Sequence, residues 1–237
     1  QGQSASEVPN APLIRQLQVD GLCMLMAGTF SPESPLARAL ETSRQPLLLF
    51  QQEKADLGSD ICVLRQDDFD GGRMTARHLI ERGARRIVAV MPQPEWPATK
   101  ARLNGIRQEI AESAHAIELT VLTSADESAA ATEGAIGSLI AAGVDFDAVI
   151  AGNDQMALAV RRNLLRNGKR IPQDVRLAGF NAFSFIDYLE QKLTTVRSPA
   201  FELGSLGAHH IIRRIETGAF DTHNVVLPVE FVPGQTT

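Results

Sequence analysis

Polar side chains follow two of the apolar runs in this sequence, at the points where the next segment would begin. Asn153 and Asp154 follow the run 147–151 after a single glycine, and Asn181 comes directly after the run 175–180. In an open α/β sheet, ligands bind at the carboxyl ends of the strands, so these three side chains are expected to project into one crevice. Amides and carboxylates exchange hydrogen bonds with polar small molecules. The pattern predicts a ligand-binding site.

Asn153 and Asp154 have a second interpretation, because both stand where the helix 154–167 is expected to begin. Asn and Asp are among the residues that most often cap the amino terminus of a helix. A capping side chain can still present an oxygen to a ligand, so the two roles are compatible. We expect Asn153 to make the direct contact and Asp154 to be the cap.

The chain's single tryptophan, Trp96, lies on the loop between the expected strand 86–91 and the expected helix 98–113. An aromatic ring can stack on the apolar face of a sugar ring or pack against the protein. Both interpretations stay open for Trp96. Two interpretations also stay open for Phe183 and Phe185, which follow Asn181. They can form a wall of the pocket or pack in the core.

The residues that could serve catalysis form no recognisable reactive group. The five histidines pair with no Ser or Cys nucleophile in a known motif, and there is no glycine-rich phosphate loop and no metal-ligand spacing. Asp67, Asp68 and Asp70 are typical of acidic residues at a helix start. Cys23 and Cys62 lie in apolar runs, where buried reduced thiols are expected. We therefore expect neither an enzyme nor a bound metal or other cofactor.

The composition limits the size and class of the molecule. With 237 residues, 44% of them hydrophobic and only 5% aromatic, the chain can form one large domain or two α/β lobes with aliphatic cores. The formal net charge of −5 argues against binding of DNA or of anionic lipid by this chain alone. No apolar run approaches the roughly 20 residues of a membrane span, and no signal peptide opens the sequence. A cytoplasmic location is expected.

Strands and helices are expected to alternate after a loose first segment, 1–12. The expected strands are 19–26, 46–50, 61–64, 86–91, 117–122, 147–151, 175–180, 193–196, 225–227 and 229–232. The expected helices are 35–42, 71–82, 98–113, 127–142, 154–167 and 199–217, several of them ended by a glycine. Such alternation predicts mostly parallel sheets with right-handed crossovers.

From Val19 onward the chain resembles the effector-binding domain of the lactose/galactose-repressor family of bacterial transcription regulators. Each matching segment is weakly specific, but the set occurs in one order along most of the chain. The segments are VDGL (19–22), GGR (71–73), HLI (78–80) with Gly83, RRI (85–87), Arg102 with Gly105, GNDQMA (152–157), IPQDV (171–175), GFN (179–181), LTTV (193–196) with Pro199, and ELG (202–204).

The resemblance implies a two-lobe α/β fold of the type I periplasmic-binding-protein kind, with parallel sheets flanked by helices and a ligand cleft between the lobes. It implies an amino-terminal lobe of residues 1–83 with 199–226, and a carboxyl-terminal lobe of 84–198 with 227–237. No segment of the sequence resembles the family's DNA-binding headpiece, its hinge helix, or the first strand and helix of the effector domain. We expect the parent protein to contain them.

Further site residues follow from the resemblance alone. Arg102 matches a position from which the family's arginine reaches into the cleft, where a guanidinium can bind vicinal hydroxyls or a carboxylate. Asp70 matches a carboxylate position near the cleft, with helix capping as its alternative. Ser198 matches a longer polar side chain at a crossing between the lobes. The expected ligand-binding set is Asp70, Trp96, Arg102, Asn153, Asp154, Asn181 and Ser198.

Asn181 departs from the family pattern, in which an aspartate is frequent at this position. An amide carries no charge and offers one acceptor and one donor group. With a carboxylate lost opposite Arg102, we expect the pocket to tolerate an anionic ligand better than a pocket for neutral sugars does. The expected effector is therefore a sugar, with a sugar acid or sugar phosphate as the preferred form.

The resemblance implies a transcription regulator, most simply a repressor, that senses this effector and acts on operator DNA through a headpiece absent from the sequence. It also implies a homodimer, with helices 71–82 and 199–217 among the contact faces. A sugar-binding protein of a transport system shares the two-lobe fold and is the alternative. The segments 171–175 and 193–196 resemble the regulator branch more closely.

Overall fold

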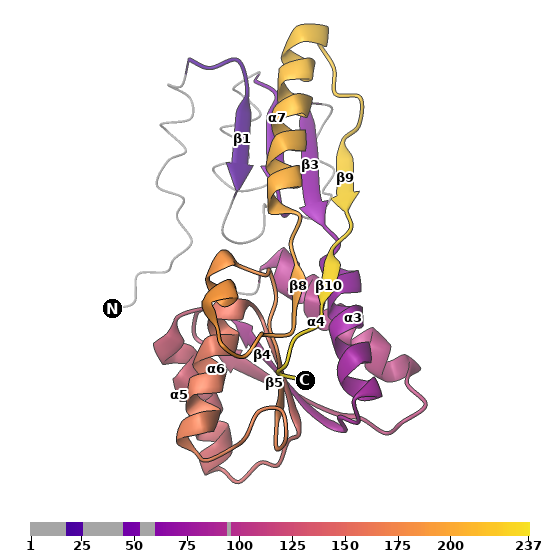
Figure 1. Cartoon of the computed structure of the whole chain (residues 1–237). Helices are drawn as coiled ribbons and strands as arrows, with labels where there is room; N and C mark the ends of the chain where they lie inside the picture. The colour runs from indigo at the N-terminus through magenta and orange to yellow at the C-terminus, as the bar shows by residue number, and fades with distance from the viewer. Residues whose placement is uncertain (1–17, 26–44, 53–59, 94–95) are drawn as a thin grey trace, which may run out of the picture. The chain divides into compact units, whose positions relative to one another are not determined.

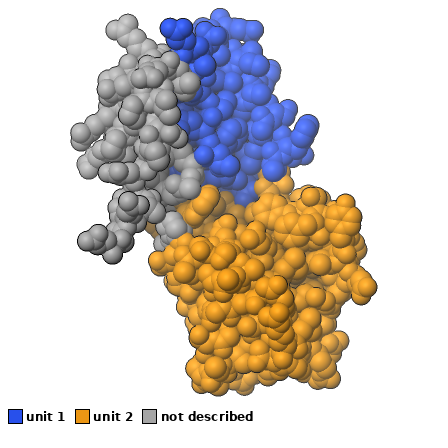
Figure 2. Space-filling view, turned by 90° about the vertical axis from the view of Figure 1, so that its left-hand side faces the viewer, with its two compact units in different colours: residues 1–66, 200–227 blue, residues 67–199, 228–237 orange. Residues whose placement is uncertain are grey.

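The computed structural model describes residues 18–25, 45–52, 60–93 and 96–237 (Figure 1). The chain divides into two compact units, residues 1–66 with 200–227 and residues 67–199 with 228–237 (Figure 2). The loose segment expected at 1–12 and the helix expected at 35–42 lie outside the described residues. The expected mostly parallel sheets are confirmed in both units, and the expected alternation of strands and helices is confirmed in the larger one.

The smaller unit contains a parallel sheet in the order β1-β2-β3-β9. Its strands are β1 (Leu22–Leu25), β2 (Leu47–Phe50), β3 (Ile61–Gln66) and β9 (Asn224–Leu227), and helix α7 (Ala200–Thr217) packs on β1, β2 and β3. Leu203 and Ile211 of α7 join the core formed by Leu48 and Leu64. Cys62 is buried as expected, and burial raises the pKa of its thiol to about 11. The expectation for Cys23 is wrong, because this thiol is exposed on β1.

The larger unit is built on a parallel sheet in the order β5-β4-β6-β7. Its strands are β4 (Arg86–Pro92), β5 (Glu118–Ser124), β6 (Ala148–Ala151) and β7 (Arg176–Ala178). Alternate residues of β4 face opposite cores: Ile87 and Ala89 lie in one core, and Val88 and Val90 lie in the other. This alternation buries the central strands on both faces, which is why β4 and β6 read as continuous apolar runs.

Helices cover both faces of that sheet (Figure 1). Helices α3 (Asp68–Glu81) and α4 (Pro97–Glu112) contribute Leu79 and Ile106 to one core, and α5 (Ala129–Ala141) and α6 (Asp154–Arg166) contribute Ile136 and Val160 to the other. A 3-10 helix, η1 (Ser184–Tyr188), was not expected from the sequence. Strands β8 (Thr195–Arg197) and β10 (Glu230–Val232) form an antiparallel pair.

The unit boundary differs from the division expected from the sequence, which placed residues 67–83 in the amino-terminal lobe. Helix α3 belongs to the larger unit because it packs closely on α4. A Cβ atom on Gly72 would lie 2.1 Å from the carbonyl oxygen of Arg102, and one on Gly105 would lie 1.9 Å from that of Phe69. Only glycine permits this approach of one helix backbone to the other. The contact also fixes the position of Arg102.

Ion pairs between the same two helices support this packing. Glu109 of α4 accepts hydrogen bonds from Arg77, with Nε–Oε1 at 2.7 Å, and from Arg73, with Nε–Oε2 at 2.9 Å. The hydrogen bonds from these arginines, that of Arg77 first, lower the pKa of the Glu109 carboxyl. The pairs join α3 to α4 on the side that faces away from the sheet core.

Candidate functional site

The polar residues expected at the strand ends lie together in the larger unit. Strands β6 and β7 are paired parallel, so the residues that follow them leave the sheet at the same edge. The backbone N–H of Asp154, after β6, donates to the carbonyl of Phe180, after β7, at 2.9 Å. The expectation that these two segments meet at one edge of the sheet is therefore correct.

Arg102 reaches this edge from helix α4, and every nitrogen of its guanidinium has an acceptor. Its Nε donates to Oδ1 of Asp68 at 2.7 Å, its Nη1 to the carbonyl of Gly152 at 2.5 Å, and its Nη2 to Oδ1 of Asn181 at 3.3 Å. The guanidinium also stacks on the ring of Phe180, 3.7 Å from the ring centroid. Arg102 is thereby held rigidly against the ends of both strands.

The charge of Arg102 is balanced inside the protein. The side chain of Arg102 is 8% exposed and that of Asp68 is 4% exposed. A buried charge without a partner is costly, and a close hydrogen-bonded carboxylate removes that cost. Asp68 was expected only as a helix-start residue, so its pairing with Arg102 was not predicted from the sequence. The residues Asp68, Gly72, Thr75 and Leu79 are all buried at helical spacing, and that pattern could have placed Asp68 on the inner face of α3.

Asn181 has a backbone conformation that few residues other than glycine adopt. Its φ is +98° and that of Ala182 is +52°. Consecutive left-handed residues other than glycine are strained and persist only when their surroundings hold them. Here the N–H of Asn181 donates to the carbonyl of Val196 at 2.8 Å, and its own carbonyl accepts from the N–H of Ser198 at 3.2 Å. The turn aims the Asn181 amide oxygen at Arg102.

The helix-capping role expected for Asp154 belongs to Asn153 instead. Asn153 is the amino-terminal cap of α6, and its Oδ1 accepts from the N–H of Met156 at 2.9 Å. Asp154 is completely buried, and its carboxylate accepts from the hydroxyl of Thr195 at 2.6 Å and from the N–H of Phe183 at 2.8 Å. The prediction that Asp154 caps the helix is wrong, because its carboxylate turns toward β8 and the loop after β7.

Burial raises the pKa of the Asp154 carboxyl to about 6, against the hydrogen bonds from Thr195 and Phe183 and the charge of Arg102, which lower it. A folded-state pKa above the unfolded value stabilises the folded protein at low pH, and this stabilisation is lost as the pH rises through the folded pKa. The rise of this pKa from its ordinary value to about 6 corresponds to about 3 kcal/mol of unfolding free energy between the fully protonated and the fully ionised carboxyl.

This shift gives a measurable pH dependence. Between pH 4 and pH 7, the free energy of unfolding of the wild-type protein should fall by about 2 kcal/mol relative to that of Asp154→Asn, which cannot titrate. Asn is the matched replacement, since its oxygen can accept from Phe183 while its NH₂ donates to Thr195. Urea titrations at several pH values measure both proteins. Parallel stability curves would contradict the raised pKa.

For the other residues of the expected ligand-binding set, the contacts are hydrogen bonds of the backbone. Asp70 is half-buried in the first turn of α3, where its N–H is capped by Asp67, and it is Asp68 that contacts Arg102. Trp96 precedes α4 and is held through its backbone by the hydroxyl of Thr99. Ser198 contacts the Asn181 carbonyl through its own N–H. The structure thus brings Arg102, Asn181 and Ser198 together.

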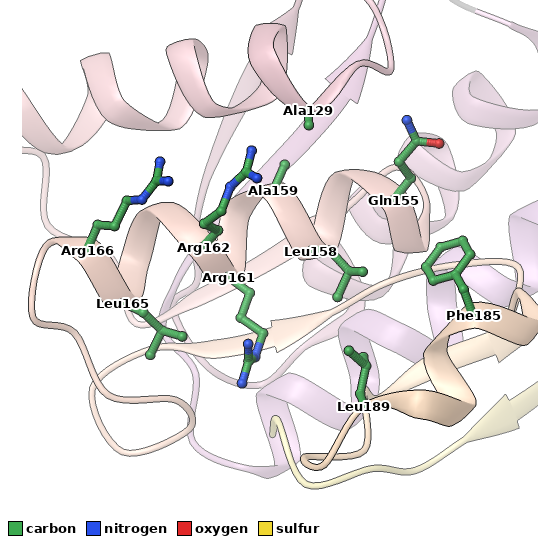
Figure 3. A pocket seen from close by; sticks show the side chains of 10 residues that line it. All are labelled: Ala129, Gln155, Leu158, Ala159, Arg161, Arg162, Leu165, Arg166, Phe185 and Leu189. Atoms are coloured by element: carbon green, nitrogen blue, oxygen red, sulfur yellow. The ribbon is translucent and has the colours of Figure 1, made fainter.

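A separate surface pocket lies on the outer side of α6, with a volume of about 660 Å³ (Figure 3). Leu158 and Leu165 line it from α6, and Phe185 and Leu189 line it from the η1 region. Phe185 is therefore part of a pocket wall, although not of the strand-end site. Phe183 is 41% exposed, which excludes its interpretation as a core residue.

The described residues contain neither a membrane-spanning helix nor a cluster of metal-ligating side chains. Within the ranges that the structure describes, no helix is long and apolar enough to cross a membrane. Within the same ranges, no group of three or more His, Cys, Asp or Glu side chains is arranged to hold a metal ion.

The chain is similar to a protein-family model and to several transcription regulators. Residues 76–237 match the family model of the periplasmic binding protein-like domain. The transcriptional regulator CelR of Thermobifida fusca is 27% identical over 197 residues, which are 83% of this chain and 57% of that protein. The repressor PurR of Escherichia coli O1:K1 / APEC is 30% identical over 204 residues, 86% of this chain and 59% of that protein. The chain thus spans less than two thirds of the length of these relatives.

Solved structures extend the comparison. A LacI family transcriptional regulator from Enterococcus faecium with bound ribose is 26% identical and superposes with a TM-score of 0.83, covering 96% of this chain and 82% of that one. The complex of CelR with cellobiose has a TM-score of 0.84 at 23% identity, covering 97% and 69% of the two chains, and so supports the fold alone. The expected fold class is confirmed by these similarities.

Proposed function

The chain belongs to the periplasmic binding protein-like domain family, in the form found in transcription regulators of the lactose-repressor type, and we propose that it is the effector-sensing part of a bacterial transcriptional repressor. The observation that carries this proposal is the set of polar groups at the ends of β6 and β7, where Arg102 and Asn181 meet. Fixed hydrogen-bonding groups at strand ends suit recognition of a polar small molecule. We assign no enzymatic activity and no cofactor to this site, and we place the regulator in the cytoplasm, where operator DNA is found.

We propose a neutral sugar as the effector class. The anionic ligand expected from the sequence rested on an uncompensated Arg102, and the ion pair with Asp68 removes that premise. Asp154 adds a second buried carboxyl near Arg102, so the site carries no surplus positive charge for an anion. The relatives agree with this choice, since they include ribose operon repressors and a regulator solved with bound ribose.

Regulation requires that the effector bind two states of the protein with different affinity. In the proposed mechanism, the sugar binds Arg102 and Asn181, favours one conformation of the effector domain and so changes the affinity of the attached headpiece for operator DNA. We propose that the intact regulator works as a homodimer, with faces of α3 and α7 among the contacts. Helix α7 exposes Phe201 at 83% and Ile212 at 54%, and exposed apolar side chains on one helix favour a protein partner.

A transport function is the less favoured alternative. The relatives named above are transcription regulators, and none of them is a component of a transporter. A periplasmic carrier would bind sugar without any change in DNA affinity. Operator binding by the parent protein in the presence and absence of the effector separates the two functions.

A thermal-shift panel tests the proposed effector class. The panel contains ribose, cellobiose, ribose 5-phosphate and gluconate, each measured over a concentration series. A neutral sugar at about 100 times its dissociation constant should stabilise the protein by about 2.7 kcal/mol, which shifts the melting temperature by several degrees. Ser128→Ala, which removes the cap of the distant helix α5, is the control and should melt lower while keeping the shift. A shift by the anionic compounds alone would refute the proposed effector class.

A further inference from the structure

The carboxylate of Asp154 joins three segments that meet at the candidate site. Its Oδ1 accepts from the hydroxyl of Thr195 on β8, and its Oδ2 accepts from the N–H of Phe183 in the loop after β7. Its own N–H donates to the carbonyl of Phe180. Asp154, at the start of α6, therefore forms hydrogen bonds with both the loop after β7 and the strand β8.

These contacts enclose the two strained residues. The carbonyl of Phe180 and the N–H of Phe183, both bonded to Asp154, stand immediately before and after Asn181 and Ala182, which have φ values of +98° and +52°. Left-handed conformations at such residues are strained and persist only under restraint from their surroundings. The two bonds from Asp154 supply restraint at both ends of the turn.

The local sequence leaves space for this arrangement. A Cβ atom on Gly179 would lie 2.4 Å from Oδ1 of Asp154, so only glycine admits the carboxylate at this point. The cap of α6 is provided by Asn153. The Asp154 carboxylate therefore serves the turn and β8 rather than the helix end.

We propose that Asp154 is a positioning residue, which clamps the left-handed turn at Asn181 and Ala182 and thereby sets the Asn181 amide against the Arg102 guanidinium. The geometry of these two groups determines which pair of ligand hydroxyls the site can bind at once. The relevance to ligand choice rests on the proposed function, whereas the clamp itself does not. Arg102 is the charged group that faces the Asp154 carboxyl, and its positive charge lowers the pKa of that carboxyl.

The test uses the full chain and measures the turn directly, without a ligand. Backbone chemical shifts and the coupling between amide and α protons report the sign of φ at Asn181 and Ala182, and hydrogen exchange reports the protection of the Phe183 amide. In Asp154→Ala, Ala182 should leave the left-handed region and exchange at Phe183 should accelerate at least tenfold. Asp154→Asn, which can keep both side-chain bonds, should retain the turn and the protection. Ser128→Ala should leave both signals unchanged.

A rescue variant separates positioning from a general structural role. Glycine adopts positive φ without strain, so Ala182→Gly in the Asp154→Ala background should restore the left-handed turn and the resonance positions of Asn181. This double variant also tests the proposed clamp if Asp154→Ala alone does not fold. The proposal is overturned if Asp154→Ala keeps positive φ at both residues, or if the double variant fails to restore the turn. If the turn responds as expected and wild type binds no sugar, the clamp stands and the proposed function fails.

Discussion

Replacing Gly105 by alanine is expected to destabilise the protein by about 3 kcal/mol, at the upper end of the range for overpacked cores. The added Cβ would lie 1.9 Å from the carbonyl oxygen of Phe69 and 3.1 Å from the backbone nitrogen of Arg73. Both atoms belong to the backbone of α3, which cannot move aside as a side chain does. The helices must separate, and that separation opens the core behind them.

The control for Gly105→Ala is Gly134→Ala in helix α5. A Cβ atom on Gly134 meets no other atom within 4 Å, and alanine is favoured over glycine inside a helix by about 0.5–1 kcal/mol. Gly134→Ala should therefore be neutral or stabilising. Urea denaturation followed by circular dichroism measures both variants. Equal midpoints for Gly105→Ala and wild type would show that α3 and α4 do not pack as described.

Asp68→Asn is expected to cost about 3–5 kcal/mol, the range found when one partner of a buried ion pair is removed. The substitution keeps the shape of the side chain and leaves the Arg102 charge without its carboxylate. The carbonyl of Gly152 and the amide oxygen of Asn181 remain as acceptors, but neither carries a charge. The destabilisation should appear in the free energy of unfolding obtained from urea denaturation.

The double variant Asp68→Asn with Arg102→Met is the comparison for this prediction. It removes both charges and keeps an apolar side chain against the ring of Phe180, so it should be more stable than Asp68→Asn alone. The single variant should also gain affinity for anionic sugars, because Arg102 then loses the carboxylate that contacts it directly and only the Asp154 carboxyl remains near it. A cost below about 1 kcal/mol, as for an exposed ion pair, would contradict the burial of this pair.

The placement of the strand-end residues could be predicted from the sequence because it follows from local pattern. Apolar runs of strand length alternate with amphipathic segments, and parallel strands bring their carboxyl ends to one edge. Asn153, Asp154 and Asn181 were located in this way. Arg102 was identified by family resemblance, since a helix arginine carries no local signal of its own.

The errors have identifiable physical causes. The helix expected at 71–82 begins three residues earlier, at Asp68. Gly72 is retained inside the helix because α4 approaches it too closely for a side chain. Asp70 was expected at the site from the family resemblance, whereas Asp68 is the carboxylate that contacts Arg102. The left-handed turn at Asn181 and Ala182 depends on tertiary contacts, and alanine gives no local indication of positive φ.

The most direct test of the proposed sensor is to follow the resonances of the Arg102 guanidinium and the Asn181 side-chain amide while ribose is titrated into the full chain. Our account predicts saturable shifts of both signals at one common dissociation constant, with little change at Phe185 in the outer pocket. Sugar binding that shifts Phe185 and leaves Arg102 and Asn181 unchanged would contradict the assignment of the site.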